Sequence, residues 1–167
     1  AAQIDPAAIK ARGVEAVINY VSEARPSAQW MRVVKPMSKD YADRLRAAGI
    51  EIVSNYQYGK TGDATPSDWR GGYEAGKRHG AIALSNHWKA GGAPWRPGYA
   101  PCDDNPTMDE VQRFVLPFIR GWAEVWGTEW TGIYANRQTW DKLKALGAPV
   151  KWFWQHFWDG GSGDKRA

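Results

Sequence analysis

The chain has little of what defines several protein classes. Its single cysteine, Cys102, excludes an internal disulfide and a zinc site built from cysteines. No apolar run approaches the roughly 20 residues that a helix needs to cross a bilayer, so no membrane span is expected. No signal peptide is recognisable either, and we therefore expect any route of export to be encoded outside this sequence.

The chain also lacks any cluster of charge of one sign. Its 22 lysines and arginines exceed its 18 aspartates and glutamates by four, and the isoelectric point is near 9.2. A mild positive charge favours anionic polymers such as cell-wall glycans. Because the basic residues form no run, no nucleic-acid partner is expected. The three histidines lack metal-ligand spacing, so we expect neither a metal nor another cofactor.

What the chain has in excess is tryptophan, with eleven residues in an otherwise ordinary composition of 43% hydrophobic and 24% charged residues. The length of 167 residues suits one domain, 1–167, which stands alone or forms part of a longer chain. Tryptophan fills protein cores and also forms flat walls for ligands. The composition therefore predicts one globular domain and is compatible with an aromatic groove.

Short apolar segments alternate with helical segments. Strands are predicted at residues 14–21, 50–56, 97–105, 131–135 and 150–157. Helices are predicted at 7–13, 39–48, 68–90, 107–126 and 137–146, three of them preceded by the capping residues Asp5, Ser38 and Thr107. This alternation predicts an α/β fold with a parallel sheet covered by helices. A closed eight-stranded barrel typically needs about 250 residues, so the sheet is smaller or the chain is incomplete.

Two predicted helices carry residues that are unfavourable in helices. Gly72, Gly76 and Gly80 recur at every fourth position of the 68–90 segment, although glycine costs roughly 1 kcal/mol in a helix interior. We expect this repeat to allow a close approach of the helix to the sheet. Pro117 lies within the apolar stripe of the 107–126 segment, where it is expected to kink the helix.

The segment PGYAPCDDNP, residues 97–106, is the candidate for a functional site. It is typical of a buried strand that ends in Asp103, Asp104 and Asn105. Since successive side chains of a strand point to opposite faces, Asp103 and Asn105 are predicted to share one face. Parallel α/β folds place their chemistry at the carboxyl ends of strands, which favours a functional carboxylate here. The alternative is a solvated turn rich in Asp and Asn.

Longer stretches resemble a known family. The segments IDPAAIKARGVEAVINYV, KPMSKDYADRLRAAGIEIVSNYQYG and DWRGGYEAGKRHGAIALSNHWKAGGAP, followed by PGYAPCDDNP, TGIYAN and FWQHFW, resemble a glycoside-hydrolase-like family formerly described as a domain of unknown function. That family occurs in mycobacterial cell-wall proteins, actinobacterial secreted proteins and phage lysins, and is distantly similar to Chalaropsis-type lysozymes. The resemblance covers nearly the whole chain. It implies a TIM-barrel-like parallel sheet surrounded by helices, here without the family's first and last strands.

The family's motifs can be placed on this sequence residue by residue. The resemblance aligns a strand-end Asp-x-Asp pair with Asp103 and Asn105, so that an amide replaces the second acid. An Arg-Tyr pair on an earlier strand aligns with Asn19 and Tyr20, so that the arginine is replaced. The remaining matches are aromatic or amide residues near strand ends, namely Tyr56 or Tyr58, Trp154 and Gln155.

The resemblance implies glycoside hydrolysis with an incomplete set of acids. Such hydrolysis normally uses two carboxyl groups, whereas substrate-assisted enzymes recruit the sugar's own acetamido group. We therefore expect Asp103 to be the acid/base, with Asn105 and Tyr134 positioning an N-acetyl sugar. The substrate-binding walls are expected to come from Tyr20, Asn19, Tyr56, Asn136, Trp154 and Gln155. For each aromatic the alternative is core packing, and for the amides Asn136 and Gln155 it is a satisfied polar group at a strand end.

Two functions from different classes remain open, with a weaker third. The first is a glycosidase of bacterial peptidoglycan, either a phage endolysin domain or an exported wall-remodelling protein, which acts outside the cytoplasm at the cell wall. The second is a non-catalytic module that binds peptidoglycan glycan strands, and the third is a phage tail component. A second carboxylate about 5 to 10 Å from Asp103 would favour the two-acid mechanism, and Asp63 and Asp159 are its expected positions.

Overall fold

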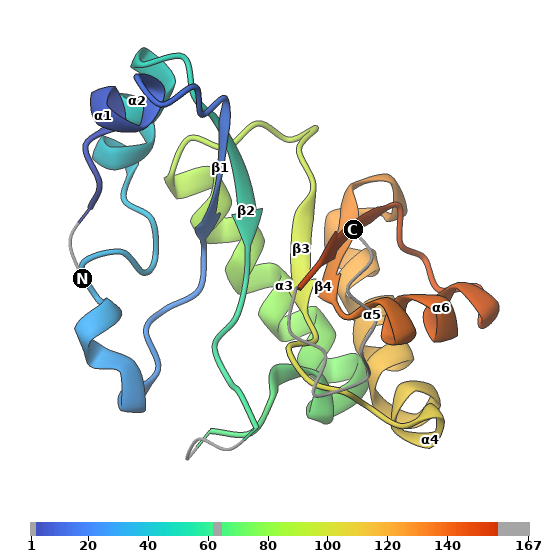
Figure 1. Cartoon of the computed structure of the whole chain (residues 1–167). Helices are drawn as coiled ribbons and strands as arrows, with labels where there is room; N and C mark the ends of the chain where they lie inside the picture. Colours follow the sequence, from blue (N-terminus) through green and yellow to red (C-terminus); the bar gives the residue numbers. More distant parts are fainter. Residues whose placement is uncertain (1–2, 62–64, 157–167) are drawn as a thin grey trace.

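The structure, a computed structural model, describes residues 3–61 and 65–156. Five strands form one parallel sheet whose order, β1-β2-β3-β4-β5, follows the chain (Figure 1). The strands are β1 (Ala16–Tyr20), β2 (Glu51–Asn55), β3 (Gly98–Pro101), β4 (Thr131–Ala135) and β5 (Trp152–Gln155). All five lie within the ranges predicted from the sequence, and the α/β fold with a parallel, partly barrel-like sheet is confirmed.

The helices also follow the predicted order. They are α1 (Pro6–Lys10), α2 (Lys39–Ala47), α3 (Gly72–Lys89), α4 (Met108–Glu110), α5 (Leu116–Trp126) and α6 (Arg137–Ala145), with short 3₁₀ segments η1 (Pro26–Met31), η2 (Asp68–Gly71) and η4 (Thr128–Trp130). Asp5, Ser38 and Thr107 each accept a backbone N–H at the start of a helix, as predicted. No helix within the described ranges is long and apolar enough to cross a bilayer.

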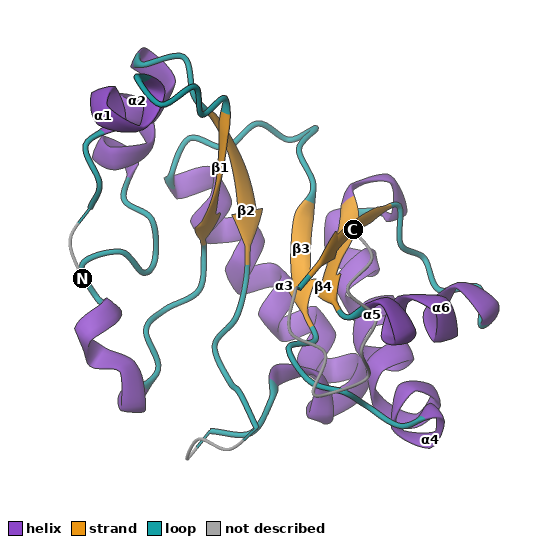
Figure 2. Ribbon diagram, viewed as in Figure 1, coloured by secondary structure: helices purple, strands orange, loops and turns teal. Residues whose placement is uncertain are grey.

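The sheet has one face covered by helices and one open face. A parallel sheet whose strand order follows the chain winds in a single direction, so its crossover helices fall on the same side. Helices α3 and α5 lie behind the strands in Figure 2. The main core includes the fully buried side chains of Trp69, Phe118 and Trp122. A second core lies beneath α2 and contains Leu45 and Ile50. We call the side turned away from α3 and α5 the open face.

The glycine repeat brings α3 against α5, not against the sheet. A Cβ built on Gly76 would lie 2.0 Å from the Phe118 carbonyl oxygen, and one built on Gly121 of α5 would lie 2.1 Å from the Tyr73 carbonyl oxygen. The two backbones therefore touch where neither helix has a side chain. The expectation of a close approach is right, but its partner is a helix, which the spacing of glycines cannot reveal.

Pro117 is accommodated by a change of helix type. The chain forms a π-helical segment, η3 (Val111–Val115), directly before α5. Proline lacks an N–H group and its ring collides with the carbonyl four residues earlier in an α-helix. A wider turn relieves this collision, and such turns occur as single insertions within α-helices. The irregularity expected at Pro117 thus takes the form of a local π-turn, a feature at which helices commonly bend.

Candidate active site at the carboxyl ends of the strands

The alternation of side chains on β3 defines which residues belong to the open face. Gly98 packs against the Trp126 ring and Ala100 lies in the main core, so both point to the helices. Tyr99 and Pro101 therefore point to the open face. Residues in register on neighbouring parallel strands point the same way. Register thus adds four side chains to the open face, namely Tyr20, Asn55, Tyr134 and Trp154.

Asp103 follows the end of β3 and is the most constrained carboxylate on the open face. Its residue surface is only 9% exposed. Oδ2 accepts hydrogen bonds from Gln57 Nε2 at 2.8 Å and from Lys60 Nζ at 2.6 Å. Oδ1 is buried and has no hydrogen-bond partner among the described residues. A buried polar atom of this kind is uncommon in folded proteins, and here it offers an acceptor to a bound molecule.

Gln57 is oriented by two groups from the segment between β1 and α2. Its carbonyl oxygen accepts hydrogen bonds from Ser22 Oγ at 2.8 Å and from Lys35 Nζ at 3.1 Å. Ser22 Oγ in turn accepts the Gln57 backbone N–H at 3.3 Å. Both Ser22 and Lys35 are buried. These contacts fix the backbone of Gln57, so its side-chain amide is held in place to reach Asp103.

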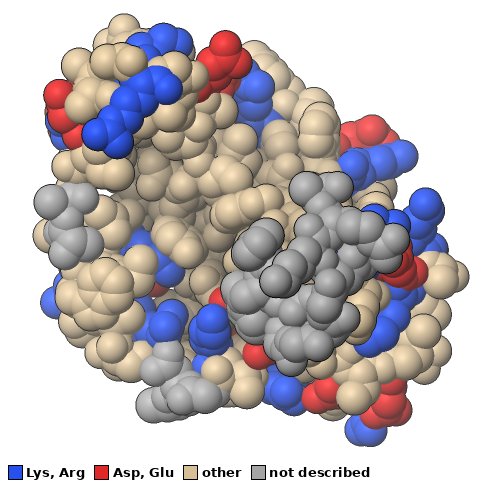
Figure 3. All heavy atoms as spheres, viewed as in Figure 1, with Lys and Arg blue, Asp and Glu red and all other residues tan. Residues whose placement is uncertain are grey.

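Lys35 and Tyr20 place a cation and an aromatic ring beside the carboxylate. Lys35 Nζ lies 3.6 Å from the centroid of the Tyr20 ring, a cation–π contact. Burial, aided by Arg25, lowers the pKa of Lys35 to about 8. Burial, followed by the negative charge of Asp103, raises the pKa of Tyr20. In the space-filling view of this side, the surface over β1 and β2 is hollowed and mostly uncharged, with lysine and arginine atoms at its edge (Figure 3).

Aromatic rings line the other side of the open face. The rings of Tyr134 and Trp154 lie 4.4 Å apart between centroids, and Tyr99 meets Trp154 edge-on at 6.3 Å. His156 continues this row, 5.3 Å from Tyr134. The three rings of Tyr99, Tyr134 and Trp154 are only half-buried. They therefore retain apolar surface on which a sugar ring can stack.

Asp104, the neighbour of Asp103, has a structural role. Its Oδ2 accepts hydrogen bonds from Trp69 Nε1 at 2.8 Å and from Ser67 Oγ. Both donors belong to the start of the η2–α3 helical region. The carboxylate therefore ties the end of β3 to the loop that follows β2, and only one of the two adjacent acids is left facing the open side.

Two predicted wall residues lie on the wrong face of the sheet. Tyr56 is 2% exposed, packs on Trp122 and makes a 2.8 Å hydrogen bond with His79 of α3. Asn19 is in register with Ser54, which also faces the helices. Strand alternation is the reason, because Asn19 precedes Tyr20 and Tyr56 precedes Gln57. The prediction that Tyr56 and Asn19 line the substrate site is therefore corrected.

The other three amides predicted for the site also differ from expectation. Gln155 is in register with Ala135, a core residue on the helix side, so it does not share the face of Trp154. Asn136 is the N-cap of α6, where Oδ1 accepts the Thr139 N–H at 2.7 Å. Its Nδ2 donates to Asn105 Oδ1. Asn105 is exposed, since β3 ends at Pro101 and the chain bends at 104, so alternation does not carry Asn105 to the side of Asp103.

A buried acid and histidine lie behind the loop that follows β2. Asp68 Oδ1 and Oδ2 accept the backbone N–H groups of Gly59 and Tyr58, each at 2.8 Å, and His79 Nε2 lies 3.8 Å from Oδ1. Burial raises the pKa of Asp68 to about 6 despite these two donors. Burial, aided by Arg78, lowers the pKa of His79 to about 4. On acidification Asp68 therefore becomes neutral first, and leaves His79 no anion to pair with.

This arrangement predicts that His79 makes the protein sensitive to acid. The imidazole gains its proton near pH 4 in the folded protein but near 6.5 in the unfolded chain. At this group the unfolded state therefore binds more protons between these values, and the contribution of His79 to folding stability falls as the pH is lowered through this window. The raised pKa of Asp68 acts in the opposite direction, so the effect of His79 is read from the difference between parent and variant. Relative to the parent, a His79→Asn variant should gain about 2 kcal/mol between pH 7 and 4.5, measured by urea unfolding. A parent–variant difference that stays constant with pH would contradict the assignment.

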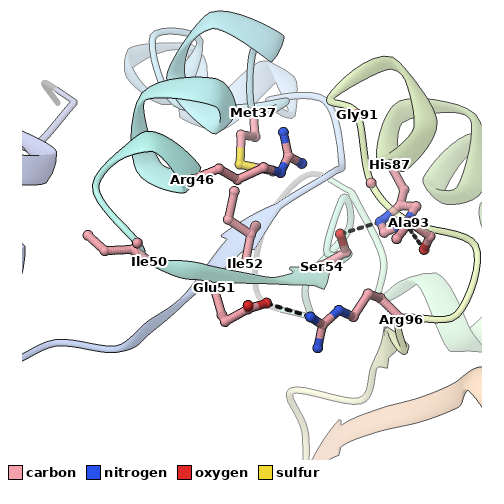
Figure 4. Close-up of a pocket in the computed structure, with 12 residues that line it drawn as sticks. Met37, Arg46, Ile50, Glu51, Ile52, Ser54, His87, Gly91, Ala93 and Arg96 are labelled. Atoms are coloured by element: carbon pink, nitrogen blue, oxygen red, sulfur yellow. Dashed lines mark hydrogen bonds and ion pairs between the residues drawn. The ribbon is translucent and has the colours of Figure 1, made fainter.

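A second hollow, of about 300 Å³, lies between α2 and α3 near the amino end of β2 (Figure 4). His87 lines it and is held at both ring nitrogens: Nε2 donates to the Ala93 carbonyl at 2.9 Å, so Nδ1 accepts the Ser54 hydroxyl at 2.8 Å. Arg96 is paired with Glu51 at 2.6 Å. Because these polar groups satisfy one another, far from the carboxyl ends of the strands, we assign the hollow to packing.

The sequence did not reveal three of the groups around Asp103. Gln57, Lys60 and Lys35 follow strands or lie in loops, and no spacing rule links them to an acid more than 40 residues away. Of the three, only Gln57 could have been inferred from the sequence. It follows Tyr56 directly after β2, so alternation predicts that its side chain points to the opposite face. Asp63 and Asp159, the expected second acids, lie outside the described residues. Within the described part of the chain, no group of three or more His, Cys, Asp or Glu residues could hold a metal ion.

The family profile and the sequence relatives that match this chain agree on one family. The profile of the family described as "Rv2525c-like, glycoside hydrolase-like domain" matches residues 7–166. The protein Rv2525c of Mycobacterium tuberculosis (strain ATCC 25618 / H37Rv), a candidate peptidoglycan hydrolase by name, is 40% identical over 161 residues. The match covers 95% of this chain and 64% of Rv2525c, so the chain spans less than two thirds of that relative.

Solved structures agree with this similarity. The crystal structure of the Tat-secreted protein Rv2525c of M. tuberculosis in complex with L-tartrate matches with a TM-score of 0.89 and 39% identity, covering 98% of this chain and 78% of that chain. An uncharacterized protein of B. stearothermophilus matches with a TM-score of 0.60 and 17% identity, covering 89% and 65% respectively. The second likeness shows the fold alone.

Proposed function

The chain belongs to the Rv2525c-like, glycoside hydrolase-like family, and from this premise we propose that it is a glycosidase acting on the glycan strands of bacterial peptidoglycan, with Asp103 as its acid/base. The observation that carries the proposal is the Asp103 carboxylate at the carboxyl end of β3. The side chain is almost buried, and Oδ2 accepts hydrogen bonds from Gln57 and Lys60. Oδ1 has no hydrogen-bond partner among the described residues. Parallel α/β enzymes of the barrel type bind their substrates at this end of the strands.

The surrounding groups fit a sugar polymer. The half-buried rings of Tyr134 and Trp154 supply flat apolar surface next to the acid, and Tyr20 supplies another ring across the sheet. We propose that Tyr134 positions an N-acetyl sugar and that Trp154 and Tyr20 form walls of the groove. Asn105 and Asn136 hydrogen bond each other at the start of α6, which favours a supporting role for this pair.

One observation favours a second function, a module that binds glycan without cutting it. Asp104, the carboxylate adjacent to Asp103, is engaged by Ser67 and Trp69 and so does not provide a second catalytic acid. Glycosidases with two carboxyl groups need both free to act on the substrate. Substrate assistance by an acetamido group is the alternative that keeps Asp103 catalytic.

The place of action is proposed from the relatives. Rv2525c is Tat-secreted, and peptidoglycan lies outside the cytoplasm. We propose that the present chain likewise acts at the wall, either as part of an exported wall-remodelling protein or as a phage endolysin. The mild positive charge of the chain is compatible with attraction to an anionic wall.

Digestion of purified mycobacterial-type peptidoglycan tests the proposal. The protein is incubated with the polymer, the soluble products are identified by mass spectrometry, and the insoluble fraction is assayed for bound protein. Soluble muropeptides with new reducing ends are expected, and their masses identify the bond that is cut. Sedimentation with the wall without release of sugar would replace the enzyme by the binding module. If the protein neither cuts nor sediments, both functions are wrong.

A further inference from the structure

The Asp103 carboxylate is paired so that its negative charge is already balanced. Lys60 Nζ lies 2.6 Å from Oδ2, while the Asp103 and Lys60 side chains are 10% and 36% exposed. Gln57 Nε2 donates to the same oxygen at 2.8 Å. Both donors approach Oδ2, which leaves the buried Oδ1 without a hydrogen-bond partner among the described residues.

The wider surroundings add positive charge. Lys35 lies over the Tyr20 ring and hydrogen bonds the Gln57 carbonyl, and the charges of Arg25 and Lys35 influence each other. A ligand at Oδ1 therefore meets an acceptor atom whose carboxylate is paired with Lys60, while Lys35 and Arg25 also act on the buried Asp68. The ionisable groups that interact directly with Asp103 are Lys60, which pairs with it, and Tyr20, on which its charge acts.

We propose that the Lys60–Asp103 ion pair recognises the acetamido group of N-acetylated glycans. Oδ1 accepts the neutral acetamido N–H, and Lys60 disfavours sugars whose free amines carry a positive charge. This inference rests on the proposed function and specifies that the same site recognises the acetamido group of the glycan. An N-acetyl N–H is a donor that plain hexose polymers lack, and a charged amine is repelled by an ammonium held close to the carboxylate.

The test compares two oligosaccharides of equal length, tetra-N-acetylchitotetraose and its fully de-N-acetylated form, at about pH 6, where the amines are charged. Dissociation constants are measured by calorimetry for the parent protein and for Lys60→Met. The parent is expected to bind the acetylated sugar about tenfold more tightly. In Lys60→Met the uncompensated carboxylate should attract the amine, so the ratio of the two constants should shift towards the amine sugar by about tenfold.

Two further variants separate charge from packing. Lys60→Arg keeps the cation and should restore the preference of the parent. Lys77→Met removes a lysine of similar exposure (40%) that is paired with Glu124 on the helix layer, and should leave the ratio unchanged. An unaltered ratio in Lys60→Met, a parent that prefers the amine sugar, or no binding of either sugar would each overturn the proposal. None of these readings requires cleavage, so failure of the peptidoglycan digestion is a separate result.

Discussion

Replacing Asp103 by Asn is expected to lower the release of reducing ends from peptidoglycan about 100-fold or more, with the fold retained. Asparagine has the same shape but cannot carry the proton or the charge that acid/base catalysis requires, a contribution of about 10²–10⁴ in rate. Lys60 is partly exposed, so water can solvate it when its partner becomes neutral. Initial rates at equal protein concentration measure the effect, and circular dichroism confirms the fold.

The matched control is Asp109→Asn. Asp109 lies on α4, its side chain is 68% exposed, and its carboxylate pairs with Arg113 one helical turn away. Exposed ion pairs of this type contribute little to stability, and Asp109 does not approach the open face through any observed contact. The control should therefore retain the activity of the parent. If Asp103→Asn retains it as well, Asp103 is not the acid/base.

Gly76→Ala is expected to destabilise the folded protein by about 3 kcal/mol or more, the largest effect we expect from a single methyl group. The added Cβ would lie 2.0 Å from the Phe118 carbonyl oxygen and 3.0 Å from the Trp122 backbone nitrogen. These atoms belong to the backbone of α5, so relief requires a shift of one whole helix, and such overpacking typically costs 1–3 kcal/mol or more. The loss is measured by urea unfolding.

Gly80→Ala, one turn further along the same helix, provides the comparison. Its Cβ would meet Trp122 and Val125 at 3.5 Å, an ordinary van der Waals distance. Alanine is favoured over glycine within helices by roughly 1 kcal/mol. This variant should therefore be neutral or up to about 1 kcal/mol more stable. Equal losses in both variants would show that general helix packing, not the Gly76 contact, limits the approach of α3 to α5.

The order and type of the main elements could be predicted because their signals are local. Short apolar runs indicated all five strands, and Asp5, Ser38 and Thr107 marked helix starts through contacts within three residues. The partner of the glycine repeat could not be predicted, since any flat surface satisfies the same spacing. The π-turn before Pro117 is likewise one of several ways to remove the same steric collision.

The site was predicted less well than the fold. Of the predicted site residues, Asp103, Tyr20, Tyr134 and Trp154 lie on the open face, whereas Tyr56, Asn19 and Gln155 lie on the helix side. The prediction placed Asn19 together with Tyr20, and Gln155 together with Trp154. Sequence neighbours on a strand point in opposite directions, so both pairs are divided between the two faces. Lys60 reaches Asp103 from a loop, and loop geometry leaves no periodic trace in the sequence.

The two adjacent acids that follow β3 hold one loop at its two ends. Asp103 holds its beginning through Gln57 and Lys60, and Asp104 holds its end through Ser67 and Trp69. Both ends of the loop are thus tied to two consecutive residues that follow a buried strand. The position of the Lys60 ammonium beside the carboxylate is therefore set by the end of β3, so a shift of this strand end would move the acid and its cationic partner together.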